Sequence, residues 1–253
     1  MAIFKSGNPA LSEKSFAKST QVYDADVVKM TERGTLNKFF LLSLLVIATA
    51  SLTWSAYYQG KDVTAWIWGG AIGGLIAAIV MAFKPMWASF LAPVYALFEG
   101  AFVGGISAYY NFAFEKVAPG IVMQAVGLTF GAVIAMFLLY RFRVIKATEK
   151  FKSIMFVATA GIAFFYLIAI VLRMFGIDIP FIHEGSMLGI GFSVLVVGIA
   201  ALNLILDFDM IENGVAMGAP KYMEWYGAFG LLVTIVWLYI EILRLLSKLS
   251  SKN

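Results

Sequence analysis

The chain has 253 residues, of which 61% are apolar and only 13% are charged, and its mean hydropathy is +0.87. These values lie outside the range of soluble domains, so the composition excludes an ordinary water-soluble protein. The absence of cysteine excludes disulfide bonds, thiolate metal sites and thiol catalysis, and a net charge of +4 gives no reason to expect a nucleic-acid partner.

Seven apolar stretches follow one another along the chain after a polar beginning. A helix that crosses a bilayer needs about 20 mostly apolar residues, and each stretch meets that length. We predict spans at 38–58, 63–83, 87–110, 119–140, 153–175, 185–207 and 224–246. The connecting loops are short, so the predicted fold class is an all-α integral membrane protein, a seven-transmembrane helical bundle embedded in lipid.

The predicted organisation is a polar cytoplasmic tail (1–37), a transmembrane domain (38–247) and a short C-terminal tail (248–253). The first segment lacks the short apolar core and cleavage site of a signal peptide, so we expect the first span to be retained. The distribution of Lys and Arg among the connecting segments predicts that the N-terminus lies on the cytoplasmic side. The loop between the fourth and fifth spans, RFRVIKATEKFK, carries the clearest signal. If all seven segments cross the membrane, the C-terminal tail lies outside the cell. If the last segment enters the membrane and returns to the side from which it came, the tail lies on the cytoplasmic side.

Small residues recur at every fourth position in the second and third predicted spans. The rows are Ala65, Gly69, Gly73 and Ala77 in the second span, with a parallel row of Gly70, Gly74, Ala78 and Ala82 beside it, and Ala88, Ala92, Ala96, Gly100, Gly104 and Ala108 in the third. Such rows let helix backbones approach closely in lipid, so they predict tight packing of these helices. Glu99 lies beside Gly100 in sequence, about 100° around the helix from the row, and we expect it to face protein rather than lipid.

Four acidic residues are set into the apolar stretches and are the candidate pH-sensor and ion-path residues: Glu99, Asp207, Asp209 and Glu241. Carboxylates are expensive in hydrocarbon and usually mark a cavity, a proton relay or an ion path. Glu99 lies mid-span, where it needs a cation, a basic partner or a proton; a neutral, hydrogen-bonded structural Glu is the alternative. Asp207 and Asp209 close the sixth predicted span, about 200° apart around a helix. Asp207 shares the face of Asn203, which predicts a polar stripe turned into the bundle.

The remaining charged candidates have simpler interpretations. Asp209 and Glu212 are also consistent with a solvated helix end. Glu241 is three residues before Arg244, so an interfacial ion pair within one helix is expected. Lys84 and Arg173 are typical of side chains that extend to the membrane surface, although they, like Arg244, are possible counter-charges for a carboxylate.

No enzyme is expected. The sequence contains none of the motifs HExxH, GxSxG or Walker A, and an aspartyl protease would need two facing aspartates, which Asp207 and Asp209 are not. His183 is interpreted as a solvated loop residue, and one His beside one Glu does not make a metal site. No cofactor and no firmly bound metal are therefore predicted.

The run LILDFDMIENGVAMGAPKYMEWYGAFGLLVTIVWLYIEILRLL resembles the C-terminal part of the Bax inhibitor-1 family, in a bacterial branch, and YALFEGAFVGGISAYYN in the third span agrees. The resemblance covers nearly the whole chain after the tail. It implies a seven-helix bundle in the bacterial inner membrane with a central last helix. It also implies a pH-sensitive calcium leak gated by two aspartates on the last two helices, of which Asp207 matches the first.

Two alignments remain open for the second aspartate. One sets Glu241 against it, but a helix rise of 1.5 Å per residue then separates its depth from that of Asp207 by on the order of 20 Å. The other alignment places the second aspartate of the family near Thr234, which carries no charge. In that case this chain lacks the pair of aspartates, and Glu99 is the candidate to replace the second one.

The sequence thus predicts a calcium-permeable, pH-sensitive leak channel, with transient calcium contacts at Asp207 and Glu99. An alternative is a regulatory protein that binds a membrane protease or a stress-pathway partner through its basic tail. A proton-coupled transporter would require an inverted repeat with broken helices, and none is evident in the sequence.

Overall fold

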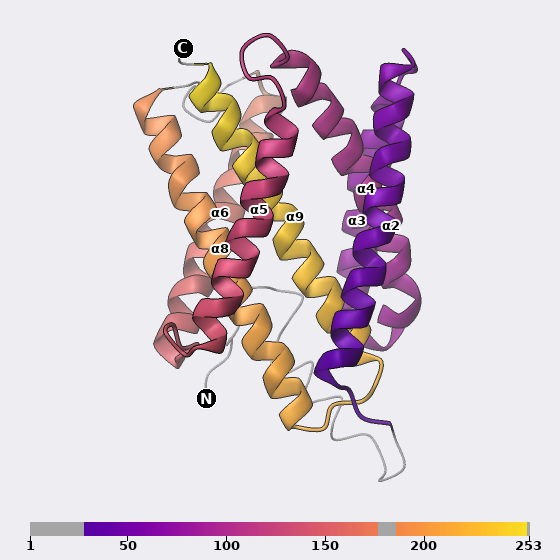
Figure 1. The fold of residues 1–253 in the computed structure, drawn as a ribbon, viewed down its shortest axis with the longest axis vertical. Helices are drawn as coiled ribbons and strands as arrows, with labels where there is room; N and C mark the ends of the chain where they lie inside the picture. The colour runs from indigo at the N-terminus through magenta and orange to yellow at the C-terminus, as the bar shows by residue number, and fades with distance from the viewer. Residues whose placement is uncertain (1–27, 177–185, 252–253) are drawn as a thin grey trace. The chain divides into compact units, whose positions relative to one another are not determined.

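Residues 28–176 and 186–251 are described in a computed structural model, and this part of the chain holds seven long helices (Figure 1). They are α2 (Glu32–Tyr58), α3 (Thr64–Phe83), α4 (Ala88–Ala113), α5 (Ile121–Arg141), α6 (Glu149–Met174), α8 (Met187–Ala216) and α9 (Met223–Ser250), with a short 3₁₀ turn, η1 (Pro85–Trp87), before α4. All seven are long and apolar enough to cross a membrane. The predicted fold class is confirmed.

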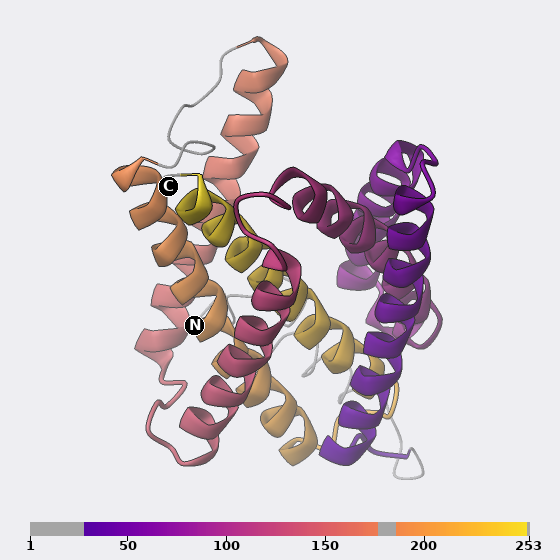
Figure 2. The same cartoon turned by 45° about the horizontal axis from the view of Figure 1, so that its top comes forward.

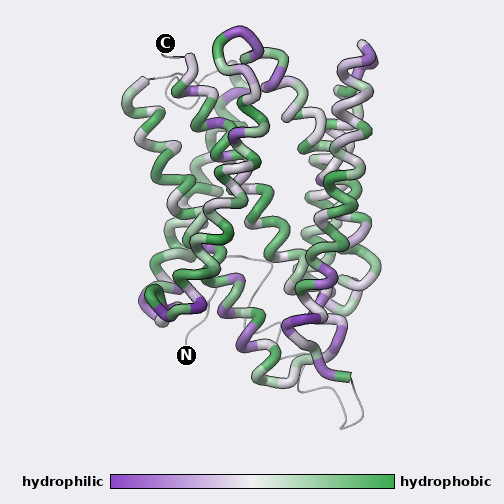
Figure 3. The backbone as a smooth tube through the Cα atoms, in the orientation of Figure 1, coloured by the Kyte–Doolittle hydropathy of each residue, from purple (hydrophilic) through white to green (hydrophobic). Residues whose placement is uncertain are grey.

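Hydropathy varies along each helix in the way a membrane protein requires. The helices are hydrophobic over most of their length, and hydrophilic residues gather in the connecting turns (Figure 3). α9 is the most buried of the seven. It is one uninterrupted helix of 28 residues, about 42 Å long at 1.5 Å per residue, so it can cross the bilayer in a single pass. This continuity argues against a last segment that enters and returns.

Two helix boundaries, the start of α2 and the end of α8, differ from the predicted spans by six residues or more. α2 begins at Glu32, within the predicted tail, because the Thr31 side chain accepts a hydrogen bond from Gly34 N at 2.9 Å and Glu32 favours the positive end of the helix. α8 continues to Ala216, nine residues beyond Asp207, so Asp207 does not close the helix. Met210 and Ile211 are buried in this extension, which explains why the helix persists through a polar stretch.

The described residues divide into two compact units, and each is treated by itself. The α2–α4 unit comprises residues 28–109 and Asp207–Val233. Its helices α2, α3 and α4 run side by side (Figures 1 and 2). A Cβ on Gly100 would lie 1.8 Å from Thr49 Oγ1 in α2, and a Cβ on Gly70 in α3 would lie 2.5 Å from Phe98 O in α4. Only glycine permits such approaches, so the tight packing predicted from the small residues is confirmed.

A short pairing joins the start of the α2–α4 unit to the turn between α8 and α9. Met30 N donates to Ala219 O at 2.7 Å, and Lys221 N donates to Val28 O at 2.9 Å, on either side of an isolated antiparallel bridge between Lys29 and Pro220. The last ten residues of the predicted tail are therefore part of a bridge and a helix, while residues 1–27 lie outside the described part.

The α5–α6 unit comprises residues 110–176, 186–206 and 234–251 of the described chain. It therefore holds α5, α6, the first two thirds of α8 and the second half of α9. Aromatic rings pack between α6 and α8: the ring centroids of Phe165 and Phe192 are 5.1 Å apart, and those of Tyr166 and Phe192 are 6.3 Å apart. Asn203 Nδ2 in α8 donates to Thr159 Oγ1 in α6 at 2.9 Å. Aromatic packing and this polar contact together hold α8 against α6.

Candidate functional site

Asp207 is the most deeply buried acidic residue among those predicted to be functional. It is 0% exposed, and Asn203, one turn earlier on the same face of α8, is 2% exposed. Asn203 Nδ2 donates to Ile199 O at 2.8 Å as well as to Thr159, while its Oδ1 accepts no hydrogen bond from the described residues. The prediction that this polar face is turned inward is confirmed.

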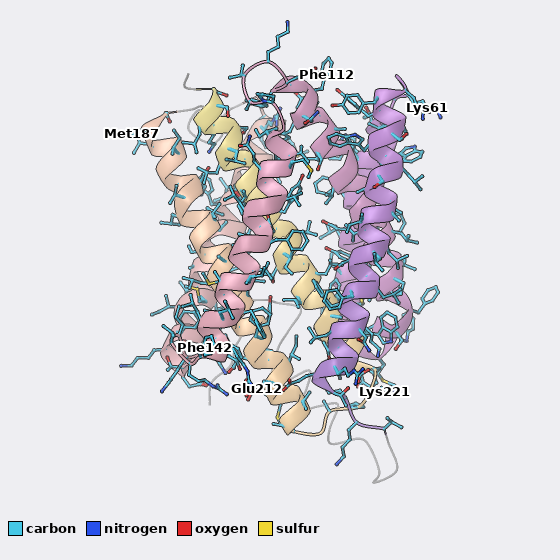
Figure 4. All side chains as sticks on the ribbon, in the orientation of Figure 1. Lys61, Phe112, Phe142, Met187, Glu212 and Lys221 are labelled. Atoms are coloured by element: carbon cyan, nitrogen blue, oxygen red, sulfur yellow. The ribbon has the colours of Figure 1, made fainter. Side chains whose placement is uncertain are left out.

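The acidic residues that follow Asp207 are less enclosed. Asp209 and Glu212 are both partly exposed. Asn213 Nδ2 donates to Asp209 Oδ2 at 2.9 Å, so this contact lies within one turn of α8. Glu212 lies near the α8–α9 turn, as does Lys221 (Figure 4). A helix turns about 100° per residue, so Asp209 points well away from the face of Asp207, as predicted.

Glu99 lies in α4 and faces its neighbours in the α2–α4 unit. Its carboxylate accepts a hydrogen bond from the hydroxyl of Tyr95, one turn earlier on α4. A Cβ on Gly74 of α3 would lie 3.2 Å from Glu99 Oε2, which confirms that Glu99 faces protein. The Tyr95 ring in turn meets Phe229 of α9 edge-on, with centroids 4.8 Å apart. Tyr95 therefore connects the Glu99 carboxylate to the packing of α9.

Glu241 belongs to a polar cluster in the α5–α6 unit. Its side chain is 2% exposed, and Arg244 Nη1 lies 2.9 Å from Glu241 Oε1, so the predicted ion pair is present. The Tyr166 hydroxyl of α6 lies 3.0 Å from Oε1 and 3.1 Å from Oε2, and Arg244 Nη1 donates to that hydroxyl at 2.5 Å. The sequence did not indicate Tyr166, because it is 75 residues away from Glu241 along the chain.

The other predicted cations lie at helix ends. Lys84 follows α3 and is exposed, with Nζ 4.5 Å from the centre of the Trp87 ring. Arg173 is exposed near the end of α6. Both positions agree with side chains that extend to the membrane surface. His183 lies outside the described residues.

Two buried charged residues of α9 were missed by sequence reasoning. Glu224, in the first turn of α9, is 2% exposed; its Oε1 accepts hydrogen bonds from Thr31 N and Thr31 Oγ1, each at 3.0 Å, and its Oε2 forms an ion pair with Lys38. Lys248 is 3% exposed near the end of α9, although the sequence placed it in a C-terminal tail. Both stand at the ends of an apolar stretch, where charged residues are ordinary, so no sequence signal separated them from solvated ones.

No three His, Asp or Glu side chains gather within residues 28–176 and 186–251 in a way that would hold a metal ion. A cation that meets these carboxylates would have at most two carboxylate or imidazole ligands there.

The sequence matches one family model, described as Bax inhibitor 1 like, over residues 8–251, which is nearly the whole chain. No curated protein and no solved structure matches it. The match covers all seven helices and every acidic residue considered above.

Proposed function

Because the chain belongs to the Bax inhibitor 1 like family, as the residues of its third and last two spans predicted, we propose that this integral membrane protein is a pH-sensitive, calcium-permeable leak channel. We place it in the bacterial inner membrane with a cytoplasmic N-terminus. The observation that carries the proposal is the complete burial of Asp207 within a membrane-spanning helix. Carboxylates at such positions are expensive and usually serve ion or proton pathways.

The chemistry follows from the two states of a buried carboxylic acid. When Asp207 holds a proton it is neutral and compatible with its surroundings; when it loses the proton it needs a cation or a donor beside it. Loss of the proton therefore favours entry of a cation, and oxygen ligands suit calcium. A site with one or two carboxylates binds weakly, and weak binding is what conduction requires.

Glu99 is the proposed partner of Asp207 in this function. Both residues belong to the α2–α4 unit, on α4 and α8. The hydrogen bond from Tyr95 and the contact of Tyr95 with Phe229 give Glu99 a route by which its charge state can influence the packing of α9. Glu241 receives less support as a sensor, because its carboxylate is already bonded to Tyr166 and Arg244.

The decisive experiment is calcium flux into liposomes that contain the purified full chain, measured between about pH 6 and pH 8. We expect the wild type to leak with a rate that changes by up to about tenfold per pH unit, the limit for one titrating group. Asp207→Asn removes the titrating carboxylate with little change of shape, so it should flatten the dependence, and Glu99→Gln should flatten it partly. Glu212→Gln, five residues along the same helix and partly exposed, is the matched control and should keep the wild-type profile.

Two results would overturn this proposal. A wild type that passes no calcium at any pH would leave the regulatory-protein alternative, and the search should then turn to partner proteins. A leak whose pH profile is identical in wild type and Asp207→Asn would remove the sensor role. A truncated chain that starts at residue 28 keeps Lys29, which pairs with Pro220, so it tests whether the tail is needed for flux.

A further inference from the structure

The turn between α5 and α6 concentrates basic residues more than any other connection from α2 to α9. Residues 141–152, RFRVIKATEKFK, hold five Lys or Arg and one Glu. Each of the other five connections, counted with four residues on either side, holds at most one Lys or Arg. Four of the five cations are exposed, and they are Arg141, Arg143, Lys146 and Lys150. The turn therefore presents a positively charged surface to its surroundings.

Arg143, in this turn, has a backbone conformation that arginine rarely adopts. Its φ is +56°, and it is the one non-glycine residue with a positive φ among residues 28–176 and 186–251. In this left-handed region the Cβ of any residue except glycine is crowded by the backbone, so the conformation costs free energy. Such strain persists at positions where the side chain has a function.

Three other helices end in the same kind of turn with glycine at the left-handed position. The residue at that position donates its N–H to the carbonyl oxygen three residues earlier: Arg143 to Tyr140 at 2.9 Å, Gly60 to Tyr57 at 2.9 Å, Gly176 to Arg173 at 3.0 Å and Gly218 to Val215 at 3.0 Å. Glycine is the usual residue here, and the turn is closed by backbone groups alone. The arginine side chain is therefore not needed to form the turn.

Two ordinary roles of basic residues do not explain an arginine at this position. The dipole of α5 favours a cation near its C-terminal end, but Arg141 in the last turn of α5 already supplies one. An excess of Lys and Arg also sets the orientation of a membrane protein. That effect depends on charge near the end of a span, and neighbouring positions can carry the charge without left-handed strain. The placement of the Arg143 side chain thus requires a separate reason.

The surroundings of Arg143 are suited to the boundary of a bilayer. Its Cζ lies 5.4 Å from the centre of the Tyr140 ring, which is buried, so the ring helps to orient the guanidinium. On either side along the chain, Phe142 is 73% exposed and Val144 is 67% exposed, and Figure 4 shows Phe142 in this turn. The turn joins two membrane-spanning helices, so it lies at the level of the lipid head groups. Exposed apolar groups at this level contact acyl chains, while a guanidinium reaches phosphate.

We propose that the turn between α5 and α6 binds the phosphate-bearing head groups of anionic phospholipids. Arg143 contacts the phosphate through its planar set of N–H donors, and Arg141, Lys146 and Lys150 supply the surrounding positive field. Membrane lipid is the partner, rather than a soluble polyanion, because exposed apolar side chains flank Arg143 in a turn between two membrane-spanning helices. The proposal does not depend on the calcium leak, because this turn lies in the α5–α6 unit, whereas Asp207 and Glu99 lie in the other.

The test uses the full chain purified in a neutral detergent, with native mass spectrometry to count bound lipids. Phosphatidylglycerol and phosphatidylcholine with identical acyl chains are added separately, and we expect the first to bind more tightly. Arg143→Gly should weaken the binding of phosphatidylglycerol by about fivefold, which corresponds to the contribution of one basic residue near an anionic surface. The binding of phosphatidylcholine should stay unchanged. In detergent without lipid, the same variant should keep or raise the unfolding temperature, because glycine adopts the turn without strain.

Three further variants make the result specific. Arg143→Gln keeps the strained backbone but removes the charge, so it should weaken binding as much as Arg143→Gly does. Lys146→Gln changes an exposed side chain of the same turn without altering the left-handed residue, and it should also weaken binding. Lys61→Gln is the matched control, because Lys61 directly follows Gly60 in the equivalent turn after α2, and it should change nothing.

Four results would overturn the proposal. The first is equal affinity for phosphatidylglycerol in wild type, Arg143→Gln and Lys146→Gln. The second is an equal loss of both lipids in these variants, which would indicate apolar contact without recognition of the head group. The third is a lower unfolding temperature of Arg143→Gly with unchanged lipid binding, which would give the arginine a structural role. The fourth is binding of soluble polyglutamate as tight as that of phosphatidylglycerol, which would indicate a soluble acidic partner.

Discussion

The two ends of α9 both bury a carboxylate beside a cation, but they balance charge differently. In the first turn, Glu224 faces one cation, Lys38, and its other oxygen accepts two hydrogen bonds from Thr31. In the last three turns, Glu241 faces Arg244, and Lys248 adds a second buried cation. Among the described residues, the first end therefore pairs one carboxylate with one cation, and the last end holds one carboxylate and two cations.

The difference predicts which of the two carboxylates the fold depends on more. Glu224 joins the start of α9 to the start of α2, beside the bridge between Lys29 and Pro220, and every polar group in that contact has a partner within the chain. Such a contact links the two helices through groups of the chain alone. In the cluster of Glu241, Arg244 and Lys248, one carboxylate meets two cations among the described residues, so removal of that carboxylate should cost more than removal of Glu224.

The largest effect is expected from Glu241→Gln. This substitution leaves Arg244 and Lys248 without any carboxylate in their cluster, and the loss of one partner from a buried ion pair costs about 3 kcal/mol or more. The free energy of unfolding can be measured in mixed micelles by titration with dodecyl sulfate. Addition of Lys248→Met to the same chain should recover about 1 kcal/mol or more, because neighbouring charges couple. Strictly additive effects would contradict the excess of positive charge.

A smaller loss, of about 2 kcal/mol, is expected from Glu224→Gln. The amide keeps an acceptor for Thr31 but removes the ion pair with Lys38, whose side chain is 17% exposed and regains some hydration. The same titration measures this change, and Glu212→Gln, on a partly exposed carboxylate, is its control. A cost equal to or larger than that of Glu241→Gln would remove the distinction between the two ends.

Gly34→Ala tests how closely the first end is packed. A Cβ at this position would lie 2.1 Å from Glu224 Oε1, so the carboxylate must shift from Thr31, and we expect a loss of about 1–2 kcal/mol. Gly69→Ala is the matched control, because a Cβ there has no neighbour within 4 Å. That control should be neutral or stabilising by up to about 1 kcal/mol, from helix propensity alone. Equal losses at both glycines would show that the Glu224 contact is not tightly packed.

Sequence reasoning predicted the features that depend on residues close together in the chain. All seven spans follow from the minimum length of apolar sequence that crosses a bilayer. The pair of Glu241 and Arg244 follows from their separation by three residues, and the burial of Asp207 from its spacing to Asn203. The C-terminal end of α8 was predicted too early, because Asp209 and Glu212 resemble a solvated helix terminus. The helix instead continues to Ala216, and Met210 and Ile211 are buried in this continuation.

The contacts that sequence reasoning could not predict join distant segments. Lys38 meets Glu224 across 186 residues, and Lys248 meets Ser193 across 55. Helical periodicity indicates which face of a helix is apolar, but in lipid the outer faces are apolar as well, so it does not identify the neighbouring helix. A charged residue at the end of a span therefore looks the same whether it is solvated or enclosed.

The smallest effect is expected from Tyr166→Phe. It removes only the hydroxyl that contacts Glu241 and Arg244, while the ring keeps its packing against Phe192, so the free energy of unfolding should fall by about 1 kcal/mol. The loss should be smaller when Glu241→Gln is already present, because the hydroxyl then donates to a neutral amide oxygen and keeps only the hydrogen bond from Arg244 to a charged group. An unchanged loss in that background would show that Tyr166 stabilises α6 by a route other than the carboxylate. The hydroxyl would then belong to helix packing and not to the charge balance of the last turns of α9.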